Sequence, residues 1–202
     1  MLAGGRGTRL GGQEKAALEI DGRSLLETRI DALREVCQEI VVVVNQRFAS
    51  RRIPGVQVVQ DIRQGCGPLM GLYSGLLASR SQLNFVTAVD MPFFKAGLFR
   101  RLLELAREGR PVWDVTIPYI RKQYEPLFAL YARTCLPAVE ELLASPQPGG
   151  RRIVAFFPKV RVRRVAAAEI IPYDAGMISF FNINTLKDLR AAGGSEQGLP
   201  GR

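Results

Sequence analysis

The sequence predicts an α/β protein, a three-layer α/β/α sandwich around a mostly parallel sheet. Short runs of β-branched and apolar residues have the length of buried strands, and stretches with the 3.6-residue period of helices lie between them. The 202 residues are enough for one domain of ordinary size with a substantial core. We therefore expect one domain over residues 1–192, followed by a polar, Gly-rich, disordered tail over residues 193–202.

The clearest strand is EIVVVV at residues 39–44, a continuous run of the kind that is buried on both faces of a parallel sheet. Ser24 and Glu27 have the spacing of a capping box and predict that a helix begins there. Pro68 suits the first turn of a helix that extends to about Ser79. Further buried strands are expected at 56–60 and 85–89, strands at 113–117, 126–131 and 160–165, a strand or loop at 180–183, and helices at 97–107, 136–144 and 186–191.

The composition excludes several kinds of chemistry. The chain has no histidine, which excludes most Ser/His, Cys/His and zinc-hydrolase schemes. Its three cysteines form no Cys-x-x-Cys pair and indicate reduced thiols rather than a zinc site or a disulfide framework. No apolar run approaches the roughly 20 residues that cross a bilayer, and no secretory signal is visible, so we expect a cytoplasmic protein.

The net charge of +9 indicates either an anionic partner or simply a basic surface. Lysine and arginine occur singly and in pairs rather than in a dense stripe, which argues against nucleic-acid binding.

Residues 2–15, LAGGRGTRLGGQEK, form a glycine-rich segment at the start of the chain. Its glycines allow the backbone to approach a triphosphate with N–H groups pointing inward. Arg9 and Lys15 could then supply cations to the β- and γ-phosphates. The segment matches neither a Walker A loop nor a strict G-x-G-x-x-G pattern, and a glycine cluster can also be a plain loop with a surface lysine after it.

Polar side chains follow the predicted strands where ligands bind in a doubly wound sheet. Asp90 could bind Mg²⁺ beside a phosphate loop, or it could simply form a turn. Asn45 and Asp61 could bind a ligand, cap helices or form Asx-turns. Asn182 and Asn184 share one face of an extended segment, which is compatible with a common site and equally with a hydrogen-bonded turn.

The pattern L-A-G-G-x-G-x-R-[LM]-G-G-x-x-K at the start resembles the signature of molybdenum cofactor guanylyltransferases, within the wider family of Rossmann-like nucleotidyltransferases. The compact spacing from Gly11-Gly12 to Lys15 fits this branch better than the sugar-phosphate branch. Small departures are Glu14, where aspartate is common, and Leu186, where proline is common. Further matching segments follow in order up to about residue 190: Asn45 after EIVVVV, Asp61 after VQVVQ, GPLMGL at 67–72, DMPF at 90–93, EPLFALY at 125–131 and FNINT at 181–185.

The resemblance implies a Rossmann-like sheet of the nucleotidyltransferase type. It also implies transfer of GMP from GTP to the terminal phosphate of molybdenum-loaded molybdopterin, with Mg²⁺ as cofactor and release of pyrophosphate. Lys15, Arg9 and Asp90 would be catalytic, and Asp90 would bind the metal. Asn182 and Asn184 would face the metal or the pterin substrate. The nucleotide-binding residues would be Leu2, Ala3, Gly4, Gly5, Lys15, Asn45, Asp61 and Asp90.

Two other functions stay open at this point. One is a nucleotidyltransferase of the same fold that uses CTP or acts on a sugar phosphate. The other is a non-catalytic module that binds nucleotides or nucleic acid, against which Lys15 and Asp90 argue. We expect GTP and molybdopterin as partners, with molybdoenzymes or their chaperones as recipients of the product. We expect no nucleic acid, no membrane and a monomer.

The start of the chain carries one more expectation. In this fold the phosphate loop follows a central strand, and strands are typically about five or six residues long. Only three residues precede Gly4. We therefore expect either a first strand of no more than three or four residues, with its neighbours short of backbone partners, or a start upstream of Met1. An apolar extension before Met1 should then raise the melting temperature.

Overall fold

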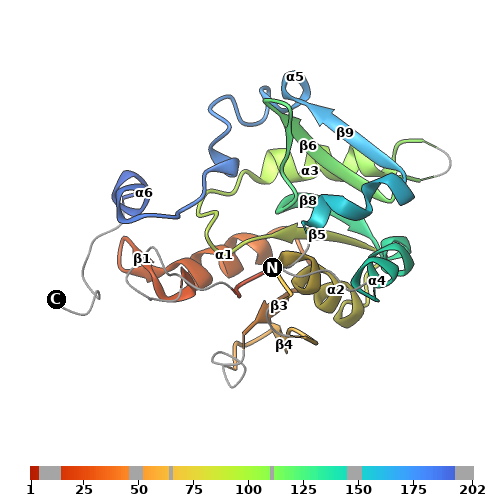
Figure 1. Cartoon of the computed structure of the whole chain (residues 1–202). Helices are drawn as coiled ribbons and strands as arrows, with labels where there is room; N and C mark the ends of the chain where they lie inside the picture. The colour runs from red at the N-terminus through yellow and green to blue at the C-terminus, as the bar shows by residue number, and fades with distance from the viewer. Residues whose placement is uncertain (5–14, 46–51, 64–65, 110–111, 145–151, 194–202) are drawn as a thin grey trace.

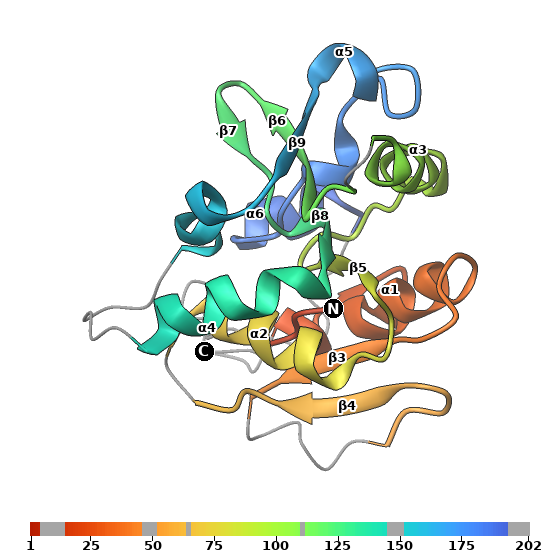
Figure 2. The same cartoon turned by 90° about the vertical axis from the view of Figure 1, so that its right-hand side faces the viewer.

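The computed structural model describes residues 1–4, 15–45, 52–63, 66–109, 112–144 and 152–193. Helices lie on both faces of a central sheet, which confirms the expected α/β class (Figures 1 and 2). Gly193, the first residue of the tail expected over residues 193–202, lies in a turn, and residues 194–202 lie outside the described residues. Within the described part of the chain, no helix is both long and apolar enough to cross a membrane.

Two parallel strands form one side of the sheet. β3 (Val41–Val44) is almost entirely buried, as a run of four valines predicts, and it pairs in register with β4 (Gln57–Gln60). The sequence predicts that β4 is buried as well, and this is wrong. Both glutamines of β4 are exposed and both valines only half-buried, because among the described residues β3 is its only neighbour in the sheet.

The other side of the sheet is mixed. β5 (Leu83–Thr87) pairs antiparallel with β8 (Phe128–Ala132), which also runs antiparallel to β6 (Val115–Ile120). β6 pairs in parallel with β9 (Val162–Ala166) and forms a hairpin with β7 (Gln123–Tyr124). The hairpin reverses the chain before β8, because a two-residue connection can join only antiparallel strands.

Residues Met1 to Ala3 join the two sides. Leu2 bridges in parallel to Val43 of β3 and to Ala88, just beyond β5. Its N–H donates to the Thr87 carbonyl at 2.8 Å, and its carbonyl accepts from the Val89 N–H at 3.0 Å. The first strand is therefore a three-residue stub at the centre of the sheet, as expected, and both views place the N-terminus in the middle of the molecule.

The helices cover the two faces of the sheet. Successive side chains of β5 point to opposite faces of the sheet: Phe85 packs toward α1 and α3, whereas Val86 packs with α2 and α4. The capping box at the start of α1 is present, since Ser24 and Glu27 each accept from the other's backbone N–H. The helices are α1 (Leu25–Arg34), α2 (Pro68–Ala78), α3 (Ala96–Arg107), α4 (Leu136–Ala144), α5 (Ala167–Ile170) and α6 (Leu186–Ala191). Short hairpin strands β1 (Glu19–Ile20) and β2 (Arg23–Ser24) precede α1, and 3-10 helices span Lys15–Ala17, Arg133–Cys135, Ile153–Lys159 and Ile178–Phe180.

The segment before α6 returns to the centre of the sheet. The Ile183 N–H donates to the Asp90 carbonyl at 2.8 Å, which ties this segment to the residues that follow β5. Thr185 caps α6 by accepting from the Asp188 N–H. Figure 1 shows α6 apart from the other helices, at the end of this extended stretch.

The amino group of Met1 is buried and donates to the Val41 carbonyl at 2.7 Å. Its pKa is lowered to about 5, mainly by burial; Cys37 opposes this shift and the nearby Arg29 adds to it. In a chain that begins at Met1, this amine is therefore neutral in the folded state at neutral pH.

For a chain that begins at Met1, we expect the free energy of unfolding to fall as the pH is lowered from 8 to 5. The ordinary pKa of the amine is 8.0 and the folded-state pKa is about 5, so within this window the unfolded state binds more protons. The loss is at most about 4 kcal/mol, since one pKa unit is worth about 1.4 kcal/mol. Urea denaturation across this range measures it. Acetylation of Met1 removes the titration and should flatten the curve; identical curves for both forms would contradict the prediction.

Candidate active site

Three of the predicted site residues meet beyond the carboxyl end of β5. The ammonium nitrogen of Lys15 lies 2.5 Å from Oδ2 of Asp90 and donates to Oδ1 of Asn184 at 2.8 Å. Lys15 opens a 3-10 helix, Asp90 follows β5, and Asn184 precedes α6. The fold thus gathers residues from the start, middle and end of the chain.

Asp90 retains an unused acceptor. Its Oδ1 is buried and has no hydrogen-bond partner within the described residues. Buried polar atoms are almost always paired, so an unpaired carboxylate oxygen suggests a partner such as a cation. A carboxylate beside an amide oxygen fits Mg²⁺, which prefers oxygen ligands and commonly takes most of them from phosphates and water. The described residues contain no group of three or more His, Cys, Asp or Glu side chains that could enclose a metal by themselves.

Arg29 lies near Asp90 and was not among the predicted site residues. Its side chain is 1% exposed, donates to Thr87 Oγ1 at 3.0 Å and to the Phe93 carbonyl at 3.4 Å, and lies over the ring of Phe94. Burial lowers its pKa to about 10, against the opposing attraction of Asp90. Arg29 therefore connects the two sides of the segment that carries Asp90 and adds a second cation near that carboxylate.

A signal for Arg29 was present in the sequence. Leu26, Ile30 and Leu33 define the apolar face of α1, and Arg29 lies on that same face. A charged residue on a buried helix face must find partners within the protein.

A second group of predicted residues lies at the ends of β3 and β4. Gly4 lies next to Asn45: a Cβ atom placed on Gly4 would be 3.6 Å from the backbone nitrogen of Asn45. Asp61 follows β4, and its Oδ1 is buried without a partner within the described residues. Burial raises the pKa of Asp61. A Cβ on Gly71 of α2 would lie 3.2 Å from Leu2 Cδ2 and 3.5 Å from Asp61 Oδ1, so close approach here depends on glycine.

The remaining predicted residues are placed differently. The side-chain nitrogen of Asn182 donates to the Phe180 carbonyl at 3.0 Å, a local contact rather than one with Lys15 or Asp90. Ala3 is buried in the stub, where its N–H donates to the Val43 carbonyl at 2.8 Å. Gly5 and Arg9 lie outside the described residues.

The fold and these two groups define a class of protein. A glycine-rich segment that leaves the central strand, with carboxylates and amides at the ends of the neighbouring strands, is typical of nucleotide-binding α/β enzymes.

Comparison with known proteins identifies the family. The model of the MobA-like NTP transferase domain matches residues 1–165. The chain is 34% identical over 189 residues to the probable molybdenum cofactor guanylyltransferase of Pelotomaculum thermopropionicum, covering 94% of this chain and 88% of that protein. It is 31% identical over 193 residues to the molybdenum cofactor guanylyltransferase of Desulfosudis oleivorans, covering 95% and 92%.

A solved structure agrees. The crystal structure of molybdopterin-guanine dinucleotide biosynthesis protein A from Archaeoglobus fulgidus superposes with a TM-score of 0.81 at 28% identity, covering 95% of this chain and 94% of that one. The chain belongs to the MobA-like NTP transferase family.

We expect Gly71→Ala to weaken nucleotide binding by roughly three- to tenfold, which corresponds to about 1 kcal/mol. The added methyl group would press on Leu2 and Asp61, which belong to the predicted nucleotide site. Gly75→Ala is the matched control, because its methyl group would meet Val43 Cγ2 at the same 3.2 Å but away from Asp61. Calorimetric titration with GTP measures both affinities. Equal affinities would show that Leu2 and Asp61 do not shape the nucleotide site.

Proposed function

We propose that this protein transfers GMP from GTP to the terminal phosphate of molybdenum-loaded molybdopterin, which forms molybdopterin guanine dinucleotide and pyrophosphate. The observation that carries the proposal is the cluster of Lys15, Asp90 and Asn184 beside the strand that leads into the glycine-rich segment. Membership of the MobA-like NTP transferase family, and the names of the relatives from Pelotomaculum and Desulfosudis, support this choice of substrates.

The reaction suits a chain without histidine. A terminal phosphate is already an anion at neutral pH, so its oxygen needs no strong base before it attacks the α-phosphorus of GTP. A new phosphorus–oxygen bond forms there, the bond to the bridging oxygen of the β-phosphate breaks, and pyrophosphate leaves with that oxygen. Catalysis then consists mainly of positioning and charge neutralisation.

Each polar group of the site has a role in this scheme. The ammonium of Lys15, with Arg9 and the backbone N–H groups of the glycine-rich segment, stabilises the charge of the leaving pyrophosphate. Asp90 and Asn184 would hold Mg²⁺, which when bound neutralises charge on the nucleotide phosphates. The unpaired Oδ1 of Asp90 supports this assignment.

The second group would recognise the nucleoside. Asn45 and the unpaired oxygen of Asp61 provide donors and acceptors for guanine and ribose. With Asn184 assigned to the metal, Asn182 is our candidate for contact with the pterin substrate. A base that fails to pair with Asp61 leaves its buried Oδ1 unsatisfied, and unpaired buried groups of this kind let a site discriminate between bases.

The test of the proposed function is a nucleotide panel with molybdenum-loaded molybdopterin and Mg²⁺. We expect pyrophosphate release with GTP to exceed that with CTP or ATP by about 10²-fold or more, because the wrong base leaves polar groups unpaired. Equal rates with CTP would assign the protein to a cytidylyltransferase activity. Absence of turnover with every nucleotide, combined with salt-dependent nucleic-acid binding, would favour the binding module instead.

We expect Asp90→Asn to lower turnover by roughly 10²-fold or more, because it removes the charge of the proposed metal ligand. The loss should persist at saturating nucleotide, and the Mg²⁺ concentration for half-maximal rate should rise. Circular dichroism and thermal melting check that the variant folds. Near-normal turnover at saturating Mg²⁺ would remove Asp90 from the metal site.

A further inference from the structure

Glu125 lies at the same edge of the sheet as Asp90. β5 and β8 run antiparallel with Thr87 opposite Phe128, so the end of β5 and the start of β8 lie side by side. Asp90 follows Thr87 by three residues. Glu125 precedes Phe128 by the same number. The two acidic residues therefore come from neighbouring strands at one edge of the sheet.

The backbone of Glu125 is fixed on both sides. Its N–H donates to the Pro118 carbonyl at 3.1 Å and extends the pairing of β6 with β7 by one step. Pro118 cannot donate in return, because proline has no N–H. The Glu125 carbonyl accepts from the Phe128 N–H at 3.1 Å instead, in a tight turn that leads into β8. The side chain of Glu125 therefore starts from a defined position.

The same pairing determines the face of the sheet on which Glu125 lies. Pro118 is opposite Val165 of β9, and residues opposite each other in neighbouring strands share a face. Val165 is buried in the core cluster of α3 and β8, against which Phe180 packs. The Phe180 carbonyl accepts from the side-chain amide of Asn182 at 3.0 Å. Glu125 thus lies on the face that the segment leading to Asn182 covers.

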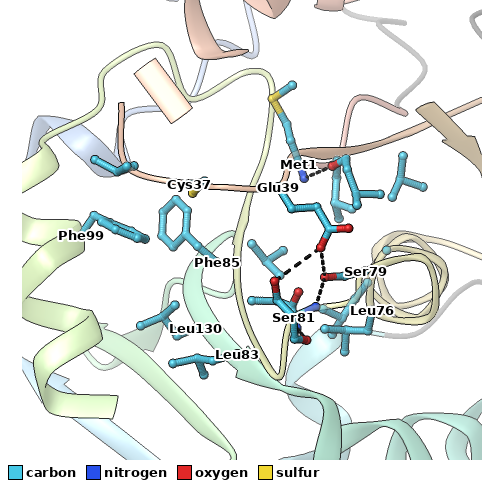
Figure 3. Close-up of a pocket in the computed structure, with 18 of the residues that line it drawn as sticks. Met1, Cys37, Glu39, Leu76, Ser79, Ser81, Leu83, Phe85, Phe99 and Leu130 are labelled. Carbon is cyan, nitrogen blue, oxygen red and sulfur yellow. Dashed lines mark hydrogen bonds between the residues drawn. The ribbon is translucent and has the colours of Figure 1, made fainter. Parts of the chain in front are cut away.

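The carboxylate of Glu125 has no hydrogen-bond or ion-pair partner within the described residues, although its side chain is half-buried. Burial raises the pKa of this carboxyl group. The half-buried carboxylate of Glu39, by contrast, accepts from the Ser79 hydroxyl at 3.0 Å and the Ser81 hydroxyl at 3.4 Å (Figure 3). Asp61 resembles Glu125, since burial raises its pKa and its Oδ1 is unpaired, and Asp61 belongs to the predicted nucleotide site. A half-buried carboxylate without donors suggests a ligand that supplies them.

We propose that Glu125 binds the pterin ring of the acceptor and determines the specificity for that ring, an inference that rests on the proposed function. The pyrimidine edge of a pterin carries two adjacent N–H donors, the amine on C2 and the ring nitrogen N3. The two oxygens of one carboxylate accept from both in a bidentate pair, and hydrogen bonds to a charged group are the stronger kind. Asn182, on the same face, contacts the same substrate.

The order of the strands supports a pterin rather than guanine at Glu125. Asp61 and Asn45 follow β4 and β3, on one side of the stub at Met1–Ala3. Asp90 follows β5 on the other side of the stub, and Glu125 precedes β8, one strand further out. The groups therefore lie along the edge in the order nucleoside, phosphates and metal, second ring. A dinucleotide with its phosphates in the middle has the same order.

Pterin and lumazine derivatives with the same phosphorylated side chain test the proposal, because lumazine has a carbonyl on C2 where pterin has the amine. Ligand fluorescence measures both affinities for the wild-type chain and for Glu125→Gln. The wild-type chain should bind the pterin about tenfold or more tightly, since a carboxylate cannot donate to the lumazine carbonyl. Glu125→Gln should lose or reverse this preference, because an amide accepts from N3 and donates to the carbonyl. The same preference in both chains, or none in the wild-type chain, would overturn the proposal.

Steady-state rates separate recognition of the ring from a structural role. Glu125→Gln should raise the KM for molybdenum-loaded molybdopterin by about 10- to 100-fold and leave the KM for GTP within about twofold. Glu104→Gln is the matched control, because it removes an exposed carboxylate of α3 whose ion pair with Arg101 lies on the surface. It should change neither KM, and thermal melting checks that both variants fold. An equal rise in both KM values for Glu125→Gln would show a structural role and overturn the proposal.

The two proposals fail in different ways. A pterin preference that depends on Glu125, without GMP transfer, would contradict the proposed function alone. GMP transfer with an unchanged KM for molybdopterin in Glu125→Gln would contradict the role of Glu125 alone.

Discussion

The structure depends on the backbone hydrogen bonds of Met1, Leu2 and Ala3. Apart from this stub, the described strands β3 and β4 pair only with each other, and β5 belongs to a separate mixed sheet. Leu2 connects the two with one parallel bridge on each side. Asn45 and Asp61 follow strands on one side of the stub, whereas Asp90 follows β5 on the other. A three-residue strand therefore sets the distance between the proposed nucleoside and metal groups.

The second constraint is electrostatic. Lys15 contacts Asp90 directly, and Arg29 is buried nearby with partners on both sides of the Asp90 segment. Two cations around one carboxylate give this part of the site a positive balance, which suits a substrate with several phosphates. Since Arg29 donates to Thr87, whose carbonyl accepts from Leu2, the same arginine also supports the strand that carries the glycine-rich segment. Thr87 thus contacts both the buried cation Arg29, through its hydroxyl, and the central strand, through its carbonyl.

Local signals predicted much of this fold. Ser24 caps α1 and Pro68 begins α2, because caps and prolines act within one helical turn. The sequence also predicted that Lys15 and Asp90 belong to one site, because Asp90 follows a predicted strand and both residues match a family motif. The sequence pattern did not predict that β8 runs antiparallel to β6. The hairpin that reverses the chain before β8 turns through Arg121 and Lys122, which adopt positive φ although they are not the Gly or Asn usual in such turns. β4 is partly exposed because, among the described strands, it has a neighbour on one side only. The hydrophobic pattern of a single segment does not show whether that segment lies at the edge or in the middle of a sheet.

The pairing of Leu2 with residues 43 and 87 to 89 also determines when the site can form during synthesis. Leu2 is synthesised before both of its partner strands, and its partners at residues 87 to 89 are made more than 80 residues later, so a long loop must close before this pairing stabilises the sheet. Lys15 must wait longer for Asn184, which is separated from it by 169 positions. A nascent chain ending at residue 165, where the family match stops, can complete the sheet around Leu2 and still lack the amide oxygen beside Lys15. The segment that carries Asn184 thus completes the charged centre only after the sheet around Leu2 can form.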